Sequence, residues 1–74
     1  MEFDYSKVRG RIAEKGLTQE GLAECIGVTP VTLTSRMHNR SEWRQSEIYK
    51  AAAVLGIADE EIKKYFFTPL VKKP

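Results

Sequence analysis

The sequence has few of the residues that build catalytic and metal sites. Its 74 residues include one cysteine, Cys25, and one histidine, His38. A single cysteine forms no intramolecular disulfide, which fits the reducing cytoplasm. Cys25 and His38 alone do not make a zinc site, and no nucleophile stands at a spacing that pairs it with a base. We therefore expect no enzymatic activity, no metal, no cofactor and no small-molecule ligand.

Long hydrophobic runs are also absent. The longest, Ala51 to Ala58, is too short to span a bilayer, and the first residues, MEFDYSK, contain no apolar signal segment. We expect a soluble cytoplasmic protein with no membrane partner. A length of 74 residues allows one small domain and leaves no room for a separate effector-sensing domain.

Neither sign of charge dominates the sequence. The formal net charge is +2 and the isoelectric point about 8.8. This balance permits binding to nucleic acid without requiring it, so the placement of the charges matters more than their sum.

Residues 18–37 follow the pattern of two short helices joined by a tight turn. The first helix is expected from about Gln19 to Cys25, with Thr18 as its N-cap. Gly27 lies where the chain must reverse direction, and glycine adopts positive φ without steric cost. A sharp angle between the two helices is therefore possible.

The second helix of this motif is expected over residues 30–38. Thr29 is placed to cap it, and Pro30 suits the first helical position because its missing N–H has no intrahelical partner to lose. Two short helices around a glycine turn predict a helix-turn-helix, which lays its second helix in the major groove of DNA.

One helix precedes this motif and two follow it. Asp4 is placed to cap the first, whose Tyr5, Val8 and Ile12 share one side, and Gly16 is expected to end it. Residues 38–45 show no apolar period and read as a loop, in which Asn39 suits the left-handed position that ends a helix.

The remaining elements are a fourth helix, a fifth helix and a tail. Ser46 is placed to cap the fourth helix, which runs through Leu55, and Asp59 to cap a short fifth helix. Pro69 prevents helical continuation, so residues 68–74 are predicted to be an extended or disordered tail. The prediction is an all-α bundle of five short helices in one domain, residues 1–67.

Several short motifs occur together between about Tyr5 and Phe67. They are Leu17-Thr18-Gln19-Glu20, Leu22-Ala23, Ile26-Gly27-Val28, Leu33, Met37 and Leu55-Gly56-Ile57. With these motifs the sequence resembles the Cro/repressor class of phage and bacterial helix-turn-helix regulators, also called the xenobiotic-response-element family. It also looks like small phage-encoded proteins that share the loop Ser41-Glu42-Trp43. The resemblance implies a compact bundle similar to lambda repressor that binds operator DNA, commonly as a dimer.

The sequence departs from the family pattern at two positions. Gly21 replaces a usual acidic residue and costs about 1 kcal/mol of helix propensity relative to alanine. Asn39 stands where the loop after the second motif helix usually carries glycine. Neither position belongs to the face that we expect to read DNA.

That face follows from the helical period. Placing Leu33 inward puts Pro30 and Met37 on the same buried side. The opposite side then carries small residues that approach base edges closely and contact thymine methyl groups or purine edges. The candidate base contacts are Val31, Thr32, Thr34, Ser35 and His38. Each threonine and serine is equally compatible with ordinary solvation, and His38 with a helix end, where a cation is favoured.

Basic and polar residues near the same helix are candidate contacts to DNA phosphates. Each phosphate neutralised contributes about −0.9 to the salt dependence of binding. The exposed start of a helix also suits an anion, and the resemblance implies a backbone contact at the first residue of the first motif helix. The candidates are Thr18, Gln19, Thr29, Arg36, Arg40 and Arg44. Glu42 and Glu47 interrupt this cluster, so part of it is equally readable as a solvated surface.

Aromatic residues are concentrated at the end of the domain. We expect Tyr65 and Phe66 in the core. One short helix cannot bury a third aromatic as well. Phe67, Leu70 and Val71 then remain available for a partner subunit. A dimer formed through them would present two recognition helices about 34 Å apart. Trp43, a large apolar residue in a polar loop, is expected to anchor that loop on the core.

The sequence thus predicts a regulator that binds double-stranded operator DNA. A homodimer is expected, either stable in solution or formed only on DNA. The alternative is a protein-interaction module on the same fold, an antirepressor or an antitoxin-like accessory protein. Salt-sensitive binding to duplex DNA separates the two readings.

Overall fold

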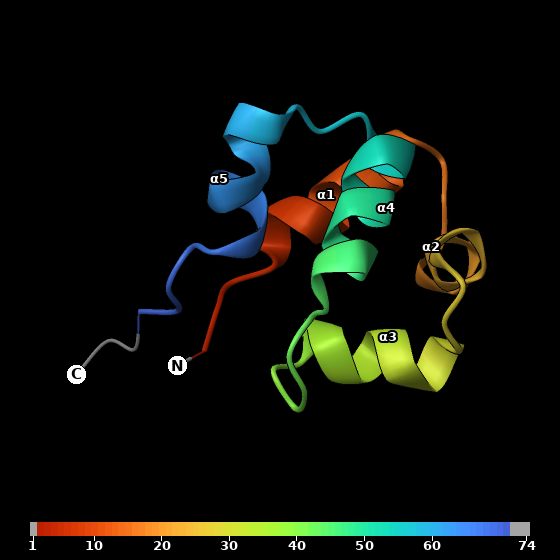
Figure 1. Cartoon of the computed structure of the whole chain (residues 1–74), viewed down its shortest axis with the longest axis horizontal. Coiled ribbons are helices and arrows are strands. Elements are labelled where there is room, and N and C mark those ends of the chain that lie inside the picture. The colour runs from red at the N-terminus through yellow and green to blue at the C-terminus, as the bar shows by residue number, and fades with distance from the viewer. Residues whose placement is uncertain (1, 72–74) are drawn as a thin grey trace.

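The computed structural model describes residues 2–71 and is all-helical. Its elements are α1 (Ser6–Glu14), α2 (Gln19–Ile26), α3 (Pro30–Met37), α4 (Gln45–Leu55), the 3₁₀ turn η1 (Asp59–Glu61) and α5 (Ile62–Phe66). In Figure 1, α3 runs across the bottom of the molecule, α2 stands beside its right end and α5 lies at the left, with α1 and α4 between them. The molecule measures 37 × 26 × 22 Å. The predicted bundle of short helices is confirmed.

The core is built by one side of each helix. From α1 and the residue before it come Tyr5, Val8 and Ile12, which confirms the predicted apolar side of this helix. The other buried hydrophobic residues are Leu22, Ala23, Ile26, Leu33, Met37, Ala51, Ala52, Leu55, Ile57 and Phe66. Tyr65, which was expected in the core, is only partly buried and packs against its edge.

The helix ends of the central motif follow local sequence rules. Thr18 Oγ1 accepts a hydrogen bond from Gly21 N–H at 3.0 Å, and Thr29 Oγ1 accepts one from Thr32 N–H at 3.1 Å. Both predicted N-caps are therefore confirmed. Gly27 follows α2 with φ of 78°, a left-handed conformation that costs a residue without Cβ nothing.

Four local expectations are wrong. Asp4 is not the N-cap of α1, because the helix begins at Ser6 and Tyr5 takes that position, and the Asp4 carboxylate accepts from Ser6 N–H instead. Ser46 does not cap α4, because the helix begins one residue earlier, at Gln45, and the carboxylate of Glu47 accepts from the N–H of Arg44 instead. Asp59 makes no capping hydrogen bond and begins a 3₁₀ turn. Pro30, expected on the buried side, is exposed, because it is the first residue of α3 and the buried residues of this helix, Leu33 and Met37, lie further along it.

The loop between α3 and α4 is held by Trp43, as predicted. Its indole ring lies edge-on to Phe66, with ring centroids 5.1 Å apart, and 6.1 Å from the ring of Tyr5. Aromatic pairs in these tilted arrangements are favourable beyond the area that they bury. The loop is therefore fixed to both α5 and the start of α1.

The two ends of the described chain pair with each other. Asp4 N–H donates to the carbonyl of Thr68 at 2.7 Å, and Leu70 N–H to the carbonyl of Glu2 at 3.0 Å. Phe3 and Pro69 thus form one antiparallel bridge, and within residues 2–71 this is the only pairing of extended segments. The predicted tail is extended up to Val71, and residues 72–74 of that prediction lie outside the described part of the chain.

Across the described residues, no helix has the length and apolarity needed to cross a membrane. The same part of the chain contains no group of three or more histidine, cysteine, aspartate or glutamate side chains placed to hold a metal ion.

Candidate nucleic-acid interface

The helix α3 is held at its start and along its inner side. Leu33 and Met37 are buried against the core. Gln19, the first residue of α2, donates from Nε2 to Thr34 Oγ1 at 3.3 Å. Thr29 both caps α3 and donates from its hydroxyl to Thr32 Oγ1 at 2.9 Å. The buried side chains and the contact from Gln19 fix the rotation of α3 about its axis relative to α2, while Thr29 holds the first turn of α3.

The predicted reading residues differ in how far they are exposed. Val31 is 80% exposed and His38 is also exposed. The other three, Thr32, Thr34 and Ser35, are half-buried. The structure therefore brings all five to the outer side or flank of one helix, with Val31 projecting furthest.

His38 lies at the C-terminal end of α3 and contacts the carbonyl of Thr34 through its side chain as well as through its backbone N–H. Its Nδ1 lies 2.9 Å from the carbonyl oxygen of Thr34. A carbonyl oxygen only accepts hydrogen bonds, so Nδ1 donates in this contact and carries the proton. The other ring nitrogen, Nε2, remains the atom with which His38 would contact a base or a phosphate.

A shallow groove separates the start of α2 from the outer side of α3. It is lined by Gln19, Glu20, Pro30, Val31, Thr34, Ser35 and Arg40. Three predicted base contacts and two predicted phosphate contacts lie in this one surface. Glu20 brings a negative charge to its edge, which weakens attraction to a phosphate there.

Arg36 has a role that the sequence did not reveal. Its Nε and Nη2 donate to the two carboxylate oxygens of Glu47 at 2.9 and 3.2 Å, and its Nη1 donates to Ser41 Oγ at 2.6 Å. The side chains of Arg36 and Glu47 are only 13% and 8% exposed. Bidentate pairing of this kind fixes geometry. Arg36 thus ties α3 to α4 and to the loop, whereas the sequence predicted a contact to a phosphate.

This pairing determines how the buried carboxylate titrates. The hydrogen bonds from Arg36 hold the pKa of Glu47 below its ordinary value, aided by the N–H of Arg44 and opposed by burial. The same carboxylate raises the pKa of the Arg36 guanidinium. Both groups are therefore charged at neutral pH.

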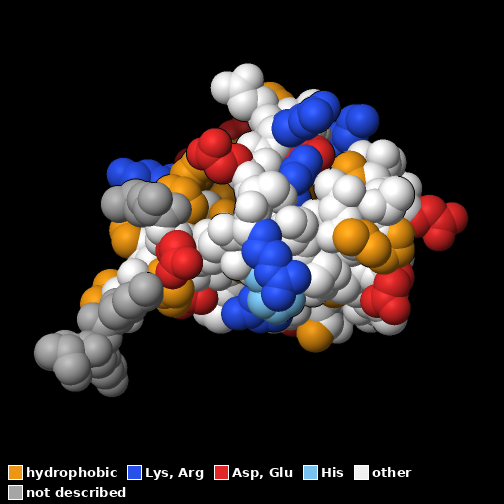
Figure 2. Space-filling view, turned by 90° about the horizontal axis from the view of Figure 1, so that it is seen from below, with side chains coloured by type: hydrophobic (Ala, Val, Ile, Leu, Met, Phe, Trp, Pro, Cys, Tyr) orange, Lys and Arg blue, Asp and Glu red, His pale blue; other side chains and the backbone are white. Residues whose placement is uncertain are grey.

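The remaining basic candidates are open to solvent. Arg40 and Arg44 are exposed, as are the predicted phosphate contacts Thr18 and Thr29 at the two helix starts, while Gln19 is half-buried. Figure 2, which faces the outer side of α3, shows Lys and Arg side chains through the middle of the surface with the histidine beside them. Acidic side chains lie toward its edges. On α3 and the loop after it, the basic side chains open to solvent are those of Arg40 and Arg44.

Sequence reasoning missed two residues that position this surface. From the sequence, Glu47 was interpreted as an interruption of the basic cluster. A glutamate at the third position of a helix is, however, half of the capping-box pattern. The other half, a serine or threonine before the helix, is absent because Arg44 occupies that place. Asn39 was predicted for its backbone conformation, and its φ is 61° as expected. Its side-chain contacts to Phe3, 36 residues away, left no signal in the sequence.

A capped, solvent-facing α3 that follows a left-handed glycine turn from α2 defines a small all-helical domain built around a helix-turn-helix. The chain belongs to the family described as Protein of unknown function (DUF739), whose model matches residues 1–69. It is similar to the modulator of repression (MOR) of the temperate bacteriophage TP901-1 from Lactococcus lactis, known from its solution structure. The two are 37% identical with a TM-score of 0.76, over 90% of each chain. This likeness supports the prediction of a small phage regulator without assigning it to the Cro/repressor family.

A curated relative of another kind also matches. The chain is 28% identical over 71 residues to isocitrate dehydrogenase kinase/phosphatase of Xanthomonas euvesicatoria pv. vesicatoria (strain 85-10). The match spans 95% of this chain but only 12% of the relative. The likeness to a regulatory phage protein is the better guide and agrees with the expectation that this chain is not an enzyme.

Proposed function

We propose that this chain is a phage-type transcription regulator that binds double-stranded operator DNA in a sequence-specific manner. In this proposal α3 enters the major groove, and occupation of the operator excludes polymerase. The observation that carries the proposal is Val31, an apolar side chain that is 80% exposed on the outer side of a capped helix.

Leaving Val31 in water forgoes the roughly 1.5–3 kcal/mol that burial of a valine supplies. Contact with the methyl group of a thymine in the major groove would recover part of that burial and would also discriminate between bases. Small neighbours support this role, since Thr32, Thr34 and Ser35 allow α3 to approach the base edges.

The contacts divide into two groups in this proposal. The base contacts are those made by Val31, Thr32, Thr34, Ser35 and His38. The phosphate contacts come from Thr18, Gln19, Thr29, Arg40 and Arg44, which fix the position of α3 without reading sequence. Arg36 leaves this second group because Glu47 and Ser41 occupy its guanidinium.

The proposed assembly is a homodimer on a two-fold symmetric operator. A single eight-residue helix reads few base pairs, and helix-turn-helix proteins extend their site by placing two such helices about 34 Å apart. Such a regulator acts in the cytoplasm, where DNA is available and the single cysteine stays reduced.

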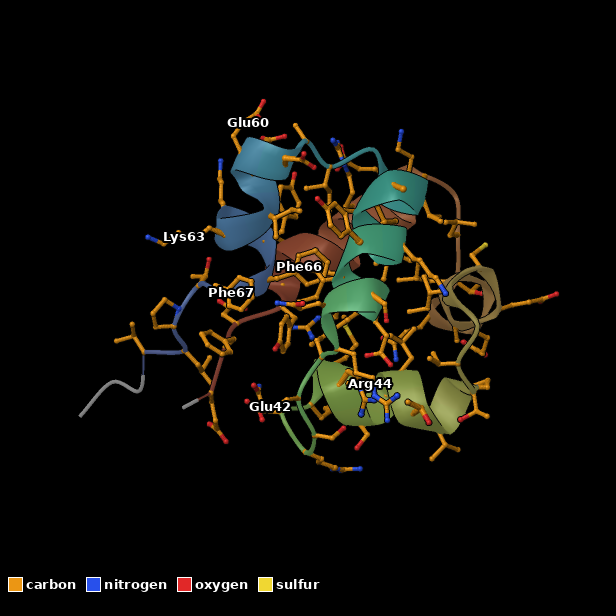
Figure 3. The ribbon with its side chains drawn as sticks, in the orientation of Figure 1. Glu42, Arg44, Glu60, Lys63, Phe66 and Phe67 are labelled. Carbon is orange, nitrogen blue, oxygen red and sulfur yellow. The ribbon has the colours of Figure 1, made fainter. Side chains whose placement is uncertain are left out.

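The test is selection of bound sequences from random duplex DNA at two salt concentrations. The wild-type chain is compared with the double variant Val31→Ala/Ser35→Ala, and with Lys63→Ala as the matched control. Lys63 lies on α5 and points away from α3 (Figure 3), so its replacement removes one positive charge without touching the reading surface.

We expect the wild-type chain and Lys63→Ala to enrich the same two-fold symmetric sequence. The double variant should lose that preference and keep weak, salt-dependent binding to any duplex. If the wild-type chain enriches nothing and shows no binding even at low salt, the regulator proposal fails. The protein-interaction reading would then take its place.

A further inference from the structure

The loop between α3 and α4 alternates between anchored and solvent-facing side chains. In residues 39–44 every second side chain is half-buried and the ones between are exposed. The half-buried members are Asn39, Ser41 and Trp43, and the exposed members are Arg40, Glu42 and Arg44. A period of two is typical of extended backbone, in which neighbouring side chains point to opposite sides. One side of the loop is therefore fastened to the protein, and both loop arginines face solvent.

Each anchored side chain of the loop is held by a different part of the fold. Asn39 Oδ1 accepts from Phe3 N–H and its Nδ2 donates to the Phe3 carbonyl, both at 2.9 Å. Trp43 packs edge-on against an aromatic ring of α5. Between these two anchors, Ser41 Oγ accepts from Nη1 of Arg36 at 2.6 Å. The Ser41 hydroxyl thus joins the middle of the loop to α3.

Arg36 offers Ser41 a donor in a fixed position. Its Nε and Nη2 donate to the two carboxylate oxygens of Glu47, and both side chains are largely buried. The N–H donors of a guanidinium form a rigid planar fork, so the two bonds to Glu47 fix the direction in which Nη1 points. The position of Ser41 is therefore set by α3 and α4 together.

The loop arginines lie beside these anchors. Arg40 N–H donates to the carbonyl of Ser35 at 2.9 Å, and the Arg40 side chain borders the groove along α3. In Figure 3, Arg44 and Glu42 leave the loop on opposite sides. The one acidic side chain of the loop is thus directed away from Arg44.

We propose that Ser41 is a positioning residue for DNA binding, which holds residues 39–44 in one conformation with Arg40 and Arg44 set for two phosphates. The inference rests on the proposed function, in which these arginines contact the DNA backbone. A loop that must be ordered on binding loses free energy in that step, whereas a loop that is already fixed does not.

A series of serine variants tests this role. Ser41→Ala removes the acceptor and Ser41→Thr keeps it. Ser46→Ala is the matched control, since Ser46 is exposed on the first turn of α4 and makes no capping contact. We expect Ser41→Ala to bind duplex DNA about three- to tenfold more weakly, while Ser41→Thr and Ser46→Ala bind as the wild type does. The slope of log affinity against log salt should be the same in all four proteins, because no charge is changed.

Hydrogen exchange of the chain without DNA separates positioning from direct contact. If Ser41 holds the loop, Ser41→Ala speeds exchange at Arg40 N–H by local opening and leaves Leu33 N–H, inside α3, unchanged. Weaker DNA binding with unchanged exchange would mean that the Ser41 hydroxyl itself contacts DNA, and would overturn the inference. Faster exchange with unchanged affinity would overturn it as well, because the order of the loop would then not matter for binding.

This inference and the proposed function fail in different ways. A wild-type chain that binds no duplex overturns the proposed function, and exchange at Arg40 still decides whether Ser41 holds the loop. A wild-type chain that binds DNA, with exchange at Arg40 unaffected by Ser41→Ala, overturns the positioning role alone.

Discussion

Glu47 is the one charged residue that is buried among residues 2–71, with 6% exposure. Its carboxylate receives hydrogen bonds from Arg36 and from the N–H of Arg44, so it links three segments of the chain. Removing one partner of such a pair leaves the other charge buried without compensation, which is costlier than the pair itself is stabilising.

Glu47→Ala is therefore expected to destabilise the fold by about 3 kcal/mol at neutral pH. Chemical denaturation followed by circular dichroism measures this loss. Glu14→Gln is the control, since Glu14 pairs with Arg11 at the surface over 3.7 Å and such exposed pairs contribute about 0–1 kcal/mol. Equal losses in the two variants would contradict a special role for Glu47.

The same residue predicts a pH dependence. The pKa of Glu47 is lowered in the folded state from its ordinary value of 4.5, so the unfolded chain binds its proton first as the pH falls. The stabilisation is present above about pH 4.5 and is lost as the pH falls through the folded-state pKa. Unfolding measured from pH 7 downward should show a shallower decline for Glu47→Gln than for the wild type.

Asp4 titrates in the same acidic range and needs its own control. The N–H of Ser6 donates to Asp4 Oδ1 at 2.9 Å and lowers the pKa of Asp4. Asp4→Asn should therefore remove a separate part of the acid sensitivity. If Asp4→Asn alone abolished the pH dependence, the assignment to Glu47 would be wrong.

At the scale of the element, α3 depends on its N-cap. It has eight residues, and short helices are marginal without tertiary contacts and caps. Thr29→Val keeps the shape of the side chain and removes the oxygen that accepts from Thr32 N–H. We expect a loss of about 1 kcal/mol in unfolding free energy, with faster hydrogen exchange at Thr32.

Thr18→Val is the matched variant for α2. Thr18 caps α2 by the same contact, to Gly21 N–H at 3.0 Å, so a similar loss is expected in that helix. Both variants remove a hydroxyl that the proposed function assigns to a phosphate contact, so both should weaken operator binding. Only Thr29→Val should also reduce the discrimination between operator and other sequences, since it alone loosens the first turn of α3. Equal discrimination by both variants would argue against reading by that turn.

The ends of a helix could be predicted from the sequence where the residues that form the cap or turn are close neighbours in the chain. Thr18, Thr29 and Gly27 act within four residues of themselves, so the caps and the turn of the motif followed from the sequence. The start of α4 did not, because its capping group is Glu47, inside the helix, and the residue before it is an arginine.

The candidate site was predictable in the same limited sense. The helical period placed Val31 outward and Leu33 and Met37 inward, as the structure has them. It could not foresee that Arg36 would be occupied, because Glu47 lies 11 residues further along and reaches it only through packing of α4. The period also could not show that Pro30, at the very end of α3, stays exposed.

At the scale of the whole molecule, the net charge of +2 is too small to bind DNA by itself. In the proposed function, the attraction to DNA therefore comes from the exposed basic residues after α3, Arg40 and Arg44. Arg40→Gln is expected to reduce the slope of log affinity against log salt by about 0.9, with unchanged unfolding free energy. Arg36→Gln should instead lower stability, because it breaks the contact to Glu47.

Fluorescence anisotropy of duplex binding across a salt series measures these slopes. The variants must be compared under conditions in which both remain folded, as checked by circular dichroism. An unchanged slope for Arg40→Gln would remove this residue from the phosphate contacts.

The pairing of segments 2–4 and 68–70 has a consequence for how the chain folds. Bringing these ends together closes a loop of nearly the whole sequence, whereas the contacts of α2 with α3 close only a short one. The entropy lost on closing a loop grows with its length, and folding therefore tends to make near contacts first. The terminal segments should pair last and open first, so the paired ends are the final part of this domain to form.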